Sequence, residues 1–303
     1  MFTKFEHIFA ELAGRADKKK MIAAWGVDGH TIAAAGKAVE LGLIEATLVG
    51  DQELIAAQCQ AEGVDINKFT IVHNPVELDA IAQAVQMVKE GQGDILMKGL
   101  CSTDKFLRAI LNKEKGLLPP KAVLSHVSVI ENPNYHKLIL LSDIAVIPLP
   151  DMKQKQTMTK YLVDTAHAMG NKTPKVAFIA ASEQMLTSMP ACMEAALLSK
   201  MVERGQIRGC VADGPLALDV AIDKESCEIK KVGGPVAGDA DCLLFPNIES
   251  ANVFYKTNSK LAGAGVHQAG MVVGAKVPCV LSSRADSIDT KLNSIAIAAI
   301  SAK

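Results

Sequence analysis

The chain has 303 residues, and its 32 lysine and arginine side chains nearly balance 33 aspartate and glutamate side chains, for a formal net charge of −1 at pH 7. This balance, without a long basic run, disfavours nucleic acid or an anionic membrane as a partner. No apolar run of about 18 residues and no signal-peptide pattern occurs, so we expect a cytoplasmic protein. The seven cysteines are scattered, and neither C-x-x-C nor H-E-x-x-H is present, which predicts reduced thiols and no metal site.

The first half alternates short apolar runs with amphipathic stretches. Strands are predicted at MIAAWG, ATLVG, FTIVH and DILMKG, with helices at about 30–43, 52–62 and 75–90. This spacing indicates right-handed βαβ units in a parallel sheet, and therefore an α/β fold. The third helix is predicted to start with Asn74 as its cap, Pro75 in first position and Glu77 completing a capping box.

The alternation of predicted strands and helices changes after Gly116. The turn signal NPNYHK between two apolar runs predicts an antiparallel hairpin, which we interpret as the start of a second domain. Alternation then resumes with a helix at about 152–170, the strand KVAFIAA, the strand CLLFP and a helix at about 249–261. Between them lies a helix whose apolar face is predicted to contain Met193, Ala196, Leu197 and Met201.

The last predicted strand and helix meet at the charged sequence SSRADS. Val280 and Leu281 suit a buried strand, and apolar residues at helical spacing begin at Ile288. Asp286 or Ser287 is predicted to cap this helix.

Ligands of open α/β sheets bind outside the carboxyl ends of the strands, where helix N-termini offer free N–H groups to anions. At this junction Ser283 and Arg284 are therefore predicted to face a ligand crevice. The alternative is structural: Arg284 forms a surface salt bridge with Asp286 or Asp289.

An earlier loop, LMKGLCSTDKFLRAIL, carries a second group of polar residues. Lys98 ends a predicted strand, and Ser102 or Thr103 can cap the helix that follows. Together with Arg108 they are predicted to hold a phosphate. The alternative is an ordinary helix cap beside a solvated lysine. P-loop and G-x-G-x-x-G motifs are absent, which disfavours a nucleoside triphosphate or dinucleotide ligand.

Four long segments together resemble the phosphate acetyltransferase and phosphate butyryltransferase family. They are DILMKGLCSTDKFLRAILNKEKGL, DGPLALDVAI, GPVAGDADCLLFPNIESANVFYK and GAGVHQAGMVVGAKVPCVLSSRADS, in order from about residue 94 to the end. Within the family, STDKFLRAILNKE, LSHVSV and SRADS are closest to the butyryltransferase branch. The resemblance implies transfer of a short acyl group, butyryl in that branch, between coenzyme A and inorganic phosphate. Coenzyme A is then a substrate, and no cofactor is bound.

The same resemblance implies an architecture. Family members are similar to isopropylmalate dehydrogenase, with two α/β domains and an active site in the cleft between them. Here the first domain is predicted to comprise residues 1–130 and 283–303, and the second residues 131–282. The resemblance also implies a homodimer or higher homo-oligomer.

By resemblance, Arg284 binds the phosphate and Ser283 donates a hydrogen bond to the reacting acyl phosphate. Transfer is expected to be direct, in a ternary complex. The acetyltransferase branch has an aspartate seven residues after the serine, where this chain has Thr290. Asp289 and Asp286 are therefore the candidate bases for the coenzyme A thiol, although an aspartate with an ordinary pKa of about 3.9 would need burial to raise its pKa.

Ser125 is a further predicted substrate-binding residue. An acyl-enzyme on Cys101, or on Ser125 activated by His126, is disfavoured, because adjacent residues of a strand point to opposite faces.

Three other functions remain open. Phosphate acetyltransferase is the first alternative, and acyl chain length depends on tertiary packing. A metal- and NAD-dependent hydroxy-acid dehydrogenase would need an aspartate cluster, for which Asp213, Asp239 and Asp241 are the candidates. A non-catalytic sensor of coenzyme A or acyl phosphate would keep Arg284 without a base.

Overall fold

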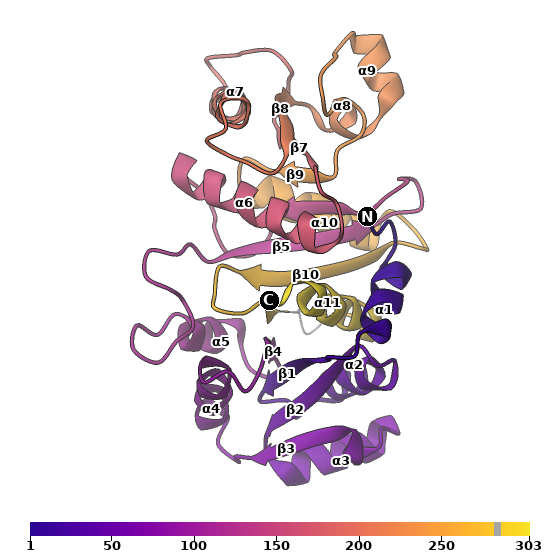
Figure 1. Ribbon diagram of the computed structural model, residues 1–303, viewed down its shortest axis with the longest axis vertical. Helices are drawn as coiled ribbons and strands as arrows, with labels where there is room; N and C mark the ends of the chain where they lie inside the picture. Colours follow the sequence, from indigo (N-terminus) through magenta and orange to yellow (C-terminus); the bar gives the residue numbers. More distant parts are fainter. Residues whose placement is uncertain (282–285) are drawn as a thin grey trace. The chain divides into compact units, whose positions relative to one another are not determined.

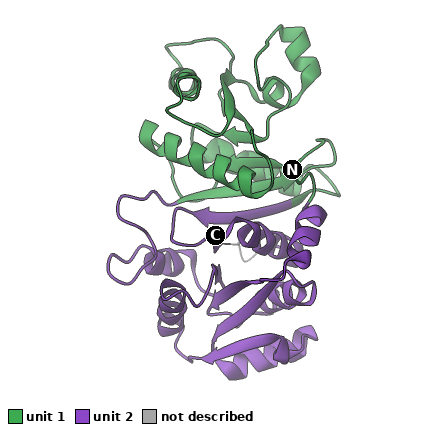
Figure 2. Ribbon diagram, viewed as in Figure 1, with its two compact units in different colours: residues 1–4, 125–267 green, residues 5–124, 268–303 purple. Residues whose placement is uncertain are grey.

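The computed structural model describes residues 1–281 and 286–303. The chain divides into two compact units (Figure 2). Unit 1 comprises Met1–Lys4 and Ser125–His267, and unit 2 comprises Phe5–Leu124 and Gln268–Lys303. The predicted site residues Ser283 and Arg284 lie outside the described residues.

Unit 2 contains a mixed sheet. Its strands are β1 (Lys19–Ala24), β2 (Ile44–Gly50), β3 (Phe69–His73), β4 (Ile95–Lys98), β10 (His267–Val273) and β11 (Cys279–Val280), in the order β3-β2-β1-β4-β11-β10. All neighbours are parallel except β10, which is antiparallel to β11. The parallel βαβ organisation predicted for the first half is therefore confirmed, and β11 returns from the far end of the sequence to lie beside β4.

Helices cover both faces of this sheet (Figure 1). They are α1 (Phe5–Gly14), α2 (Gly29–Glu40), α3 (Gln52–Glu62), α4 (Glu77–Lys89), α5 (Thr103–Ile110) and α11 (Ile288–Ser301), with a short 3₁₀ turn at Ile66–Lys68. On one side α11 packs against α1 and α2, and on the other α4 packs against α5. The helix α11 is buried on every side from Lys291 to Ile300, so it is a core helix and not the one-sided helix that the sequence predicts.

The predicted start of α4 is wrong by two residues. Its N-cap is Val76, which makes no side-chain cap hydrogen bond. Asn74 instead accepts a hydrogen bond from the Val76 amide at 3.2 Å, which closes a local turn before the helix. The Glu77 carboxylate pairs with Lys105 of α5 at 2.6 Å, so the neighbouring helix takes the group that a capping box would need.

Unit 1 begins with the predicted hairpin. Its strands are β5 (Ser125–Glu131), β6 (Ile139–Ser142), β7 (Lys175–Ile179), β8 (Val211–Leu216) and β9 (Cys242–Leu244), in the order β5-β6-β9-β7-β8. Strands β5 and β6 are antiparallel, which confirms the hairpin, while β6, β9, β7 and β8 run parallel to one another.

Five helices enclose the unit 1 sheet. They are α6 (Met152–Ala168), α7 (Pro190–Glu203), α8 (Leu218–Ile222), α9 (Lys224–Lys230) and α10 (Ile248–Lys260). Side chains alternate across a strand, and in β7 Ala177 and Ile179 belong to the core formed with α8, α9 and α10. Phe178 lies on the other face, toward α7. The buried Lys155 of α6 forms an ion pair with Glu194 of α7, so these two helices share that face.

The predicted buried face of α7 is wrong. Met193 is 43% exposed and Leu197 is 48% exposed. The buried side is made by Cys192, Ala195 and Leu198. This side packs against β7 and β8, so Met193 and Leu197 lie on the outer side of the helix.

Within residues 1–281 and 286–303, every helix is too short or too polar to cross a bilayer.

Candidate active site

The carboxyl ends of β1, β4 and β11 meet at one edge of the unit 2 sheet. The register aligns Ala24 with Lys98, and Val280 with Met97. The loops that leave β1 and β4 run together, because the Gly99 amide donates to the Ala24 carbonyl at 3.0 Å. A Cβ atom on Gly99 would lie 2.1 Å from the Trp25 carbonyl oxygen, so only glycine fits this close approach. The edge therefore brings the predicted Lys98 loop beside the segment that follows β1.

Lys98 is buried at this edge, with 4% of its surface exposed. Its ammonium donates to the carbonyl oxygens of Gly99 at 3.2 Å and Cys101 at 2.9 Å. The structure thus overturns the alternative of a solvated lysine. Two carbonyls orient a cation at the carboxyl end of β4.

The helix after this loop begins as predicted. Ser102 is the N-cap of α5 and accepts a hydrogen bond from the Lys105 amide at 3.3 Å, and Thr103 is the first helical residue. Arg108 lies in the last turn, at the opposite end of the helix from the cap. It is strongly exposed and pairs with Asp104 at 3.0 Å. Lys98, Ser102 and Thr103 thus lie in the short segment from the end of β4 to the first residue of α5, whereas Arg108 lies at the far end of that helix.

Two candidate carboxylates lie near the start of α11, Asp286 just before the helix and Asp289 in its first turn. Ser287 caps α11 by accepting a hydrogen bond from the Thr290 amide at 3.1 Å, which decides between the two predicted caps. Asp289 is exposed and lies 3.3 Å from the Lys37 ammonium on α2. Asp286 is less exposed than Asp289. The predicted bases thus differ in environment, and Asp289 already has a cationic partner.

Lys291 belongs to this edge, and our sequence prediction missed it. It is 4% exposed, although it carries a charge. Burial lowers the pKa of the ammonium, the charge of Asp28 raises it, Lys98 lowers it further and Asp286 raises it. These charges come from the start of α2, the end of β4 and the segment before α11. One signal was available, because Lys291 falls on the helical spacing of the apolar residues that start at Ile288.

Asp28 was missed as well. It caps α2, with Oδ1 accepting a hydrogen bond from the Thr31 amide at 3.0 Å. Its Oδ2 atom is buried and has no hydrogen-bond partner among the described residues. The edge therefore contains a buried negative charge as well as two buried lysines.

Ser125 lies in unit 1, at the start of β5. Its buried hydroxyl donates to Asp143 Oδ2 at 2.8 Å, and the same oxygen accepts the His126 amide at 3.1 Å. The His126 ring is 3.2 Å from the Ser128 hydroxyl, two residues along the strand and therefore on the same face. Ser125 thus donates its hydroxyl proton to Asp143, and the His126 ring lies beside the Ser128 hydroxyl.

Cys101 is also a poor nucleophile in this structure. It is 1% exposed, and burial raises the pKa of its thiol more than the nearby Lys98 charge lowers it. A thiol reacts as the thiolate, so burial opposes an acyl-enzyme on this residue.

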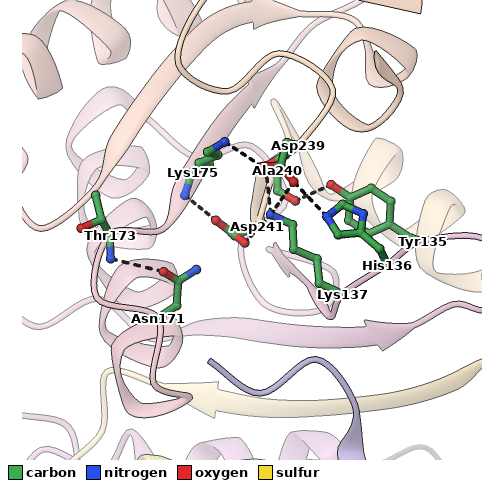
Figure 3. Close-up of polar contacts among 9 residues, drawn as sticks. All are labelled: Tyr135, His136, Lys137, Asn171, Thr173, Lys175, Asp239, Ala240 and Asp241. Carbon is green, nitrogen blue, oxygen red and sulfur yellow. Dashed lines mark hydrogen bonds and ion pairs between the residues drawn. The ribbon is translucent and has the colours of Figure 1, made fainter. Parts of the chain in front are cut away.

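The three aspartates proposed for a dehydrogenase metal site are used differently. Asp239 and Asp241 form ion pairs with lysines in unit 1 (Figure 3). Asp213 lines a separate pocket of about 560 Å³ beside α7 and β8, and burial raises the pKa of its carboxyl. The described residues contain no group of three or more histidine, cysteine, aspartate or glutamate side chains placed to hold a metal ion.

Lys137 is the centre of the ion-pair network in Figure 3. It is 5% exposed and lies 2.9 Å from Asp239 Oδ1 and 2.6 Å from Asp241 Oδ1. Asp241 Oδ1 accepts no hydrogen bond within the described part of the chain, so the second contact is an ion pair alone. Lys175 reaches the other Asp239 oxygen at 2.7 Å. The network joins the hairpin to the segment before β9, which is a structural role.

Known proteins with similar sequences belong to the family that this sequence resembles. A family model described as phosphate acetyl/butaryl transferase matches residues 67–299. A phosphate butyryltransferase of Clostridium acetobutylicum is 43% identical over 300 residues, covering 99% of this chain and 98% of that protein. The chain belongs to the phosphate acetyl/butyryl transferase family. A phosphate acetyltransferase of Thermotoga maritima is another relative, 40% identical over 286 residues, or 94% of this chain and 96% of that protein.

Solved structures of this family have the same fold. A branched-chain phosphotransacylase from Enterococcus faecalis superimposes with a TM-score of 0.82 at 28% identity, covering 93% of this chain and 98% of that chain. A 4-hydroxythreonine-4-phosphate dehydrogenase from Klebsiella pneumoniae has a TM-score of 0.58 at 10% identity, covering 93% and 98%, and shares the fold alone. The α/β fold class predicted from the sequence is confirmed.

Proposed function

We propose that the protein transfers a butyryl group between coenzyme A and inorganic phosphate: acyl-CoA and phosphate give acyl phosphate and coenzyme A. The observation that carries this proposal is the 43% identity to a phosphate butyryltransferase across 99% of the chain. Phosphate acetyltransferase is the second candidate, supported by the 40% identical relative.

The proposed chemistry is direct attack in a ternary complex. A phosphate oxygen adds to the thioester carbonyl, the C–S bond breaks, and the thiolate leaves with its electron pair and takes up a proton. In the reverse direction the thiol loses that proton and attacks the acyl phosphate carbonyl. We assign Arg284 to the phosphate and Ser283 to the hydrogen bond on the reacting group.

The base remains a choice between Asp286 and Asp289. The structure favours Asp286, because Asp289 is exposed and paired with Lys37 at 3.3 Å. Asp286 is less exposed than Asp289. Lys98, Ser102 and Thr103 are proposed to contact the phosphate, whereas Arg108 and Ser125 gain no support from their positions.

We further propose an isopropylmalate dehydrogenase-like arrangement of two α/β domains, residues 1–130 with 283–303 and residues 131–282. The compact units change at Ser125 and at Gln268, near the first proposed boundary and 15 residues before the second. We also propose a homodimer or higher homo-oligomer, because α7 exposes Met193 and Leu197 on one side. A cytoplasmic location and the lack of a resident cofactor are proposed from the sequence.

Acyl preference is tested by steady-state kinetics with acetyl-, propionyl-, butyryl- and branched-chain acyl-CoA, each with and without phosphate. We expect phosphate-dependent release of coenzyme A with the highest kcat/KM for butyryl-CoA. A higher kcat/KM for acetyl-CoA would favour the acetyltransferase. Turnover that requires Mg²⁺ and a nicotinamide cofactor, with none on acyl-CoA, would favour a dehydrogenase.

A further inference from the structure

Trp25 has a backbone conformation that is unusual for a bulky residue. It follows β1 directly and has a φ of 56°, in the left-handed region that favours glycine. Within the described residues, Lys121 and Lys231 are the other non-glycine residues with a positive φ. Such a conformation is unfavourable for an aromatic residue and persists only where the surrounding structure holds it.

Hydrogen bonds to both neighbouring strand ends hold this conformation. The Trp25 carbonyl accepts a hydrogen bond at 2.9 Å from the amide of Leu100, in the segment after β4. On the other side, the Gly26 amide donates to the Val49 carbonyl of β2 at 3.1 Å. Trp25 is therefore fixed at the carboxyl edge of the unit 2 sheet, between the ends of β2 and β4 (Figure 1).

The indole of Trp25 is half-buried and lies outside the hydrophobic core. A Cβ atom on Gly50 would lie 3.6 Å from Trp25 Cε3, so the ring packs beside the end of β2. This packing covers one part of the ring and leaves the rest exposed. Glycine would adopt the same backbone without strain, and residues held in strained conformations cluster at ligand sites. The exposed part of the ring lies at the edge where open α/β sheets bind their ligands.

The proposed substrates offer one partner for a flat aromatic surface. Coenzyme A contains an adenine ring, whereas phosphate and the butyryl group have no aromatic part. A base that stacks on an aromatic side chain gains a substantial share of its affinity from that contact. Neighbouring strands are about 4.8 Å apart, so the ends of β2 and β4, on either side of β1, are about 10 Å apart. Coenzyme A is long enough to react at its thiol beside β4 and to place its adenine beside β2.

From this geometry we propose that Trp25 binds the adenine ring of coenzyme A by stacking. This inference rests on the proposed acyl transfer and adds a residue to its coenzyme A site. Trp25 is a binding residue at a distance from the reacting atoms. Its loss should therefore weaken the affinity for coenzyme A and leave both the affinity for phosphate and the chemical step unchanged.

Trp25 is the only tryptophan of the chain, so intrinsic tryptophan fluorescence reports on this residue alone. Coenzyme A should quench the emission of the wild-type protein saturably, and so should adenosine diphosphate, which has the adenine without the pantetheine arm. Pantetheine, which has the arm without the adenine, should leave the emission unchanged. Isothermal titration calorimetry measures coenzyme A binding on the same samples. Coenzyme A binding without quenching, or quenching by pantetheine and not by the nucleotide, would overturn the proposal.

Kinetics of Trp25→Gly and Trp25→Phe provide a second test, with Lys231→Gly as a matched control. Trp25→Gly removes the ring and keeps the left-handed backbone, so KM for butyryl-CoA should rise roughly tenfold. KM for phosphate and kcat should stay within about twofold of the wild type. Trp25→Phe keeps an aromatic ring and should recover most of the affinity. Lys231 has a φ of 55° at the end of α9, so Lys231→Gly makes the same backbone change in unit 1 and should match the wild type.

An unchanged KM for butyryl-CoA in a folded Trp25→Gly variant would contradict the stacking role, and so would an equal rise in KM for phosphate. If Trp25→Gly does not fold, the fluorescence of the wild-type protein decides. A wild-type protein that neither binds coenzyme A nor transfers an acyl group would instead refute the proposed function, which is a different outcome.

Discussion

At the scale of single residues, substitution of Arg284 distinguishes a phosphate-binding role from a surface salt bridge. If it binds the phosphate, Arg284→Ala should lower kcat/KM for phosphate by roughly 10²- to 10³-fold, the range for losing one charge-stabilising donor. Arg284→Lys keeps the charge but not the bidentate fork, so it should recover only part of the rate. Thermal melts of both variants check folding. A near-wild-type kcat/KM in the alanine variant would show that Arg284 has a structural role and does not bind the phosphate.

The two candidate bases give a second residue-scale prediction. Asp286→Asn should lower kcat by about 10²-fold or more, whereas Asp289→Asn should remain within about threefold of the wild type. The reason is that Asp289 is exposed and forms an ion pair with Lys37, and such pairs contribute little. The kcat values for acyl phosphate with coenzyme A measure the difference. Equal losses, or a larger loss in Asp289→Asn, would reverse the assignment.

The ion pairs of Asp239 are expected to make the free energy of unfolding depend on pH. Burial alone would raise the pKa of this carboxyl, but hydrogen bonds and charges from Lys175 and Lys137 overcome burial and hold the pKa well below its usual range. The folded-state pKa is lower than the unfolded value of about 3.9, so the stabilisation is complete above that value and is lost as pH falls toward the folded pKa.

Asp239→Asn should therefore lower the free energy of unfolding by about 3 kcal/mol at pH 7, because it leaves Lys137 buried with one carboxylate fewer. The difference from wild type should shrink in urea melts below about pH 4. Asp164→Asn is the control, since its pair with Lys160 is exposed and should contribute less than about 1 kcal/mol. A difference independent of pH would contradict the ion-pair account.

At the scale of elements, the periodicity of apolar residues predicted which of these segments are helices and which are strands. It did not predict where α4 begins or which faces of α7 and α11 are buried. The start of α4 differs because Glu77 pairs with Lys105 of another helix, a tertiary contact that local capping rules do not include. The face of α7 differs because Cys192, Ala195 and Leu198 form the side that packs against β7 and β8, a tertiary contact that periodicity alone does not specify. In α11 the apolar residues were recognised, but burial on all sides depends on α1 and α2, which are remote in sequence.

The exposed stripe of α7 predicts self-association. Light scattering of the wild type should give a mass above the 32.1 kDa of one chain. Leu197→Glu places a charge at a position that is 48% exposed, so it should weaken association without lowering the melting temperature of the subunit. Val253→Glu on α10, 64% exposed, is the control. A wild-type species of only 32.1 kDa at micromolar concentration would refute the proposal.

At the scale of the whole molecule, the α/β class was predictable from the alternation of strand and helix patterns, and the family was predictable because several long segments match together. Part of the site was also predictable, since Lys98 and Ser102 lie at the end of a recognisable strand and the start of a helix. Lys291 and Asp28 were not predicted. Lys291 falls on the helical spacing that starts at Ile288, but the burial of both residues depends on packing between segments that are remote in sequence. The interpretation of Ser283 and Arg284 stays a prediction.

The most direct test of acyl transfer is ³¹P NMR of the purified protein with butyryl-CoA and inorganic phosphate, without added metal or nicotinamide cofactor. We predict a new acyl phosphate signal that grows in step with free coenzyme A thiol, one thiol for each phosphate consumed. Free thiol without acyl phosphate would indicate thioester hydrolysis, and no reaction at all would leave a non-catalytic sensor. Either result would contradict a phosphate butyryltransferase.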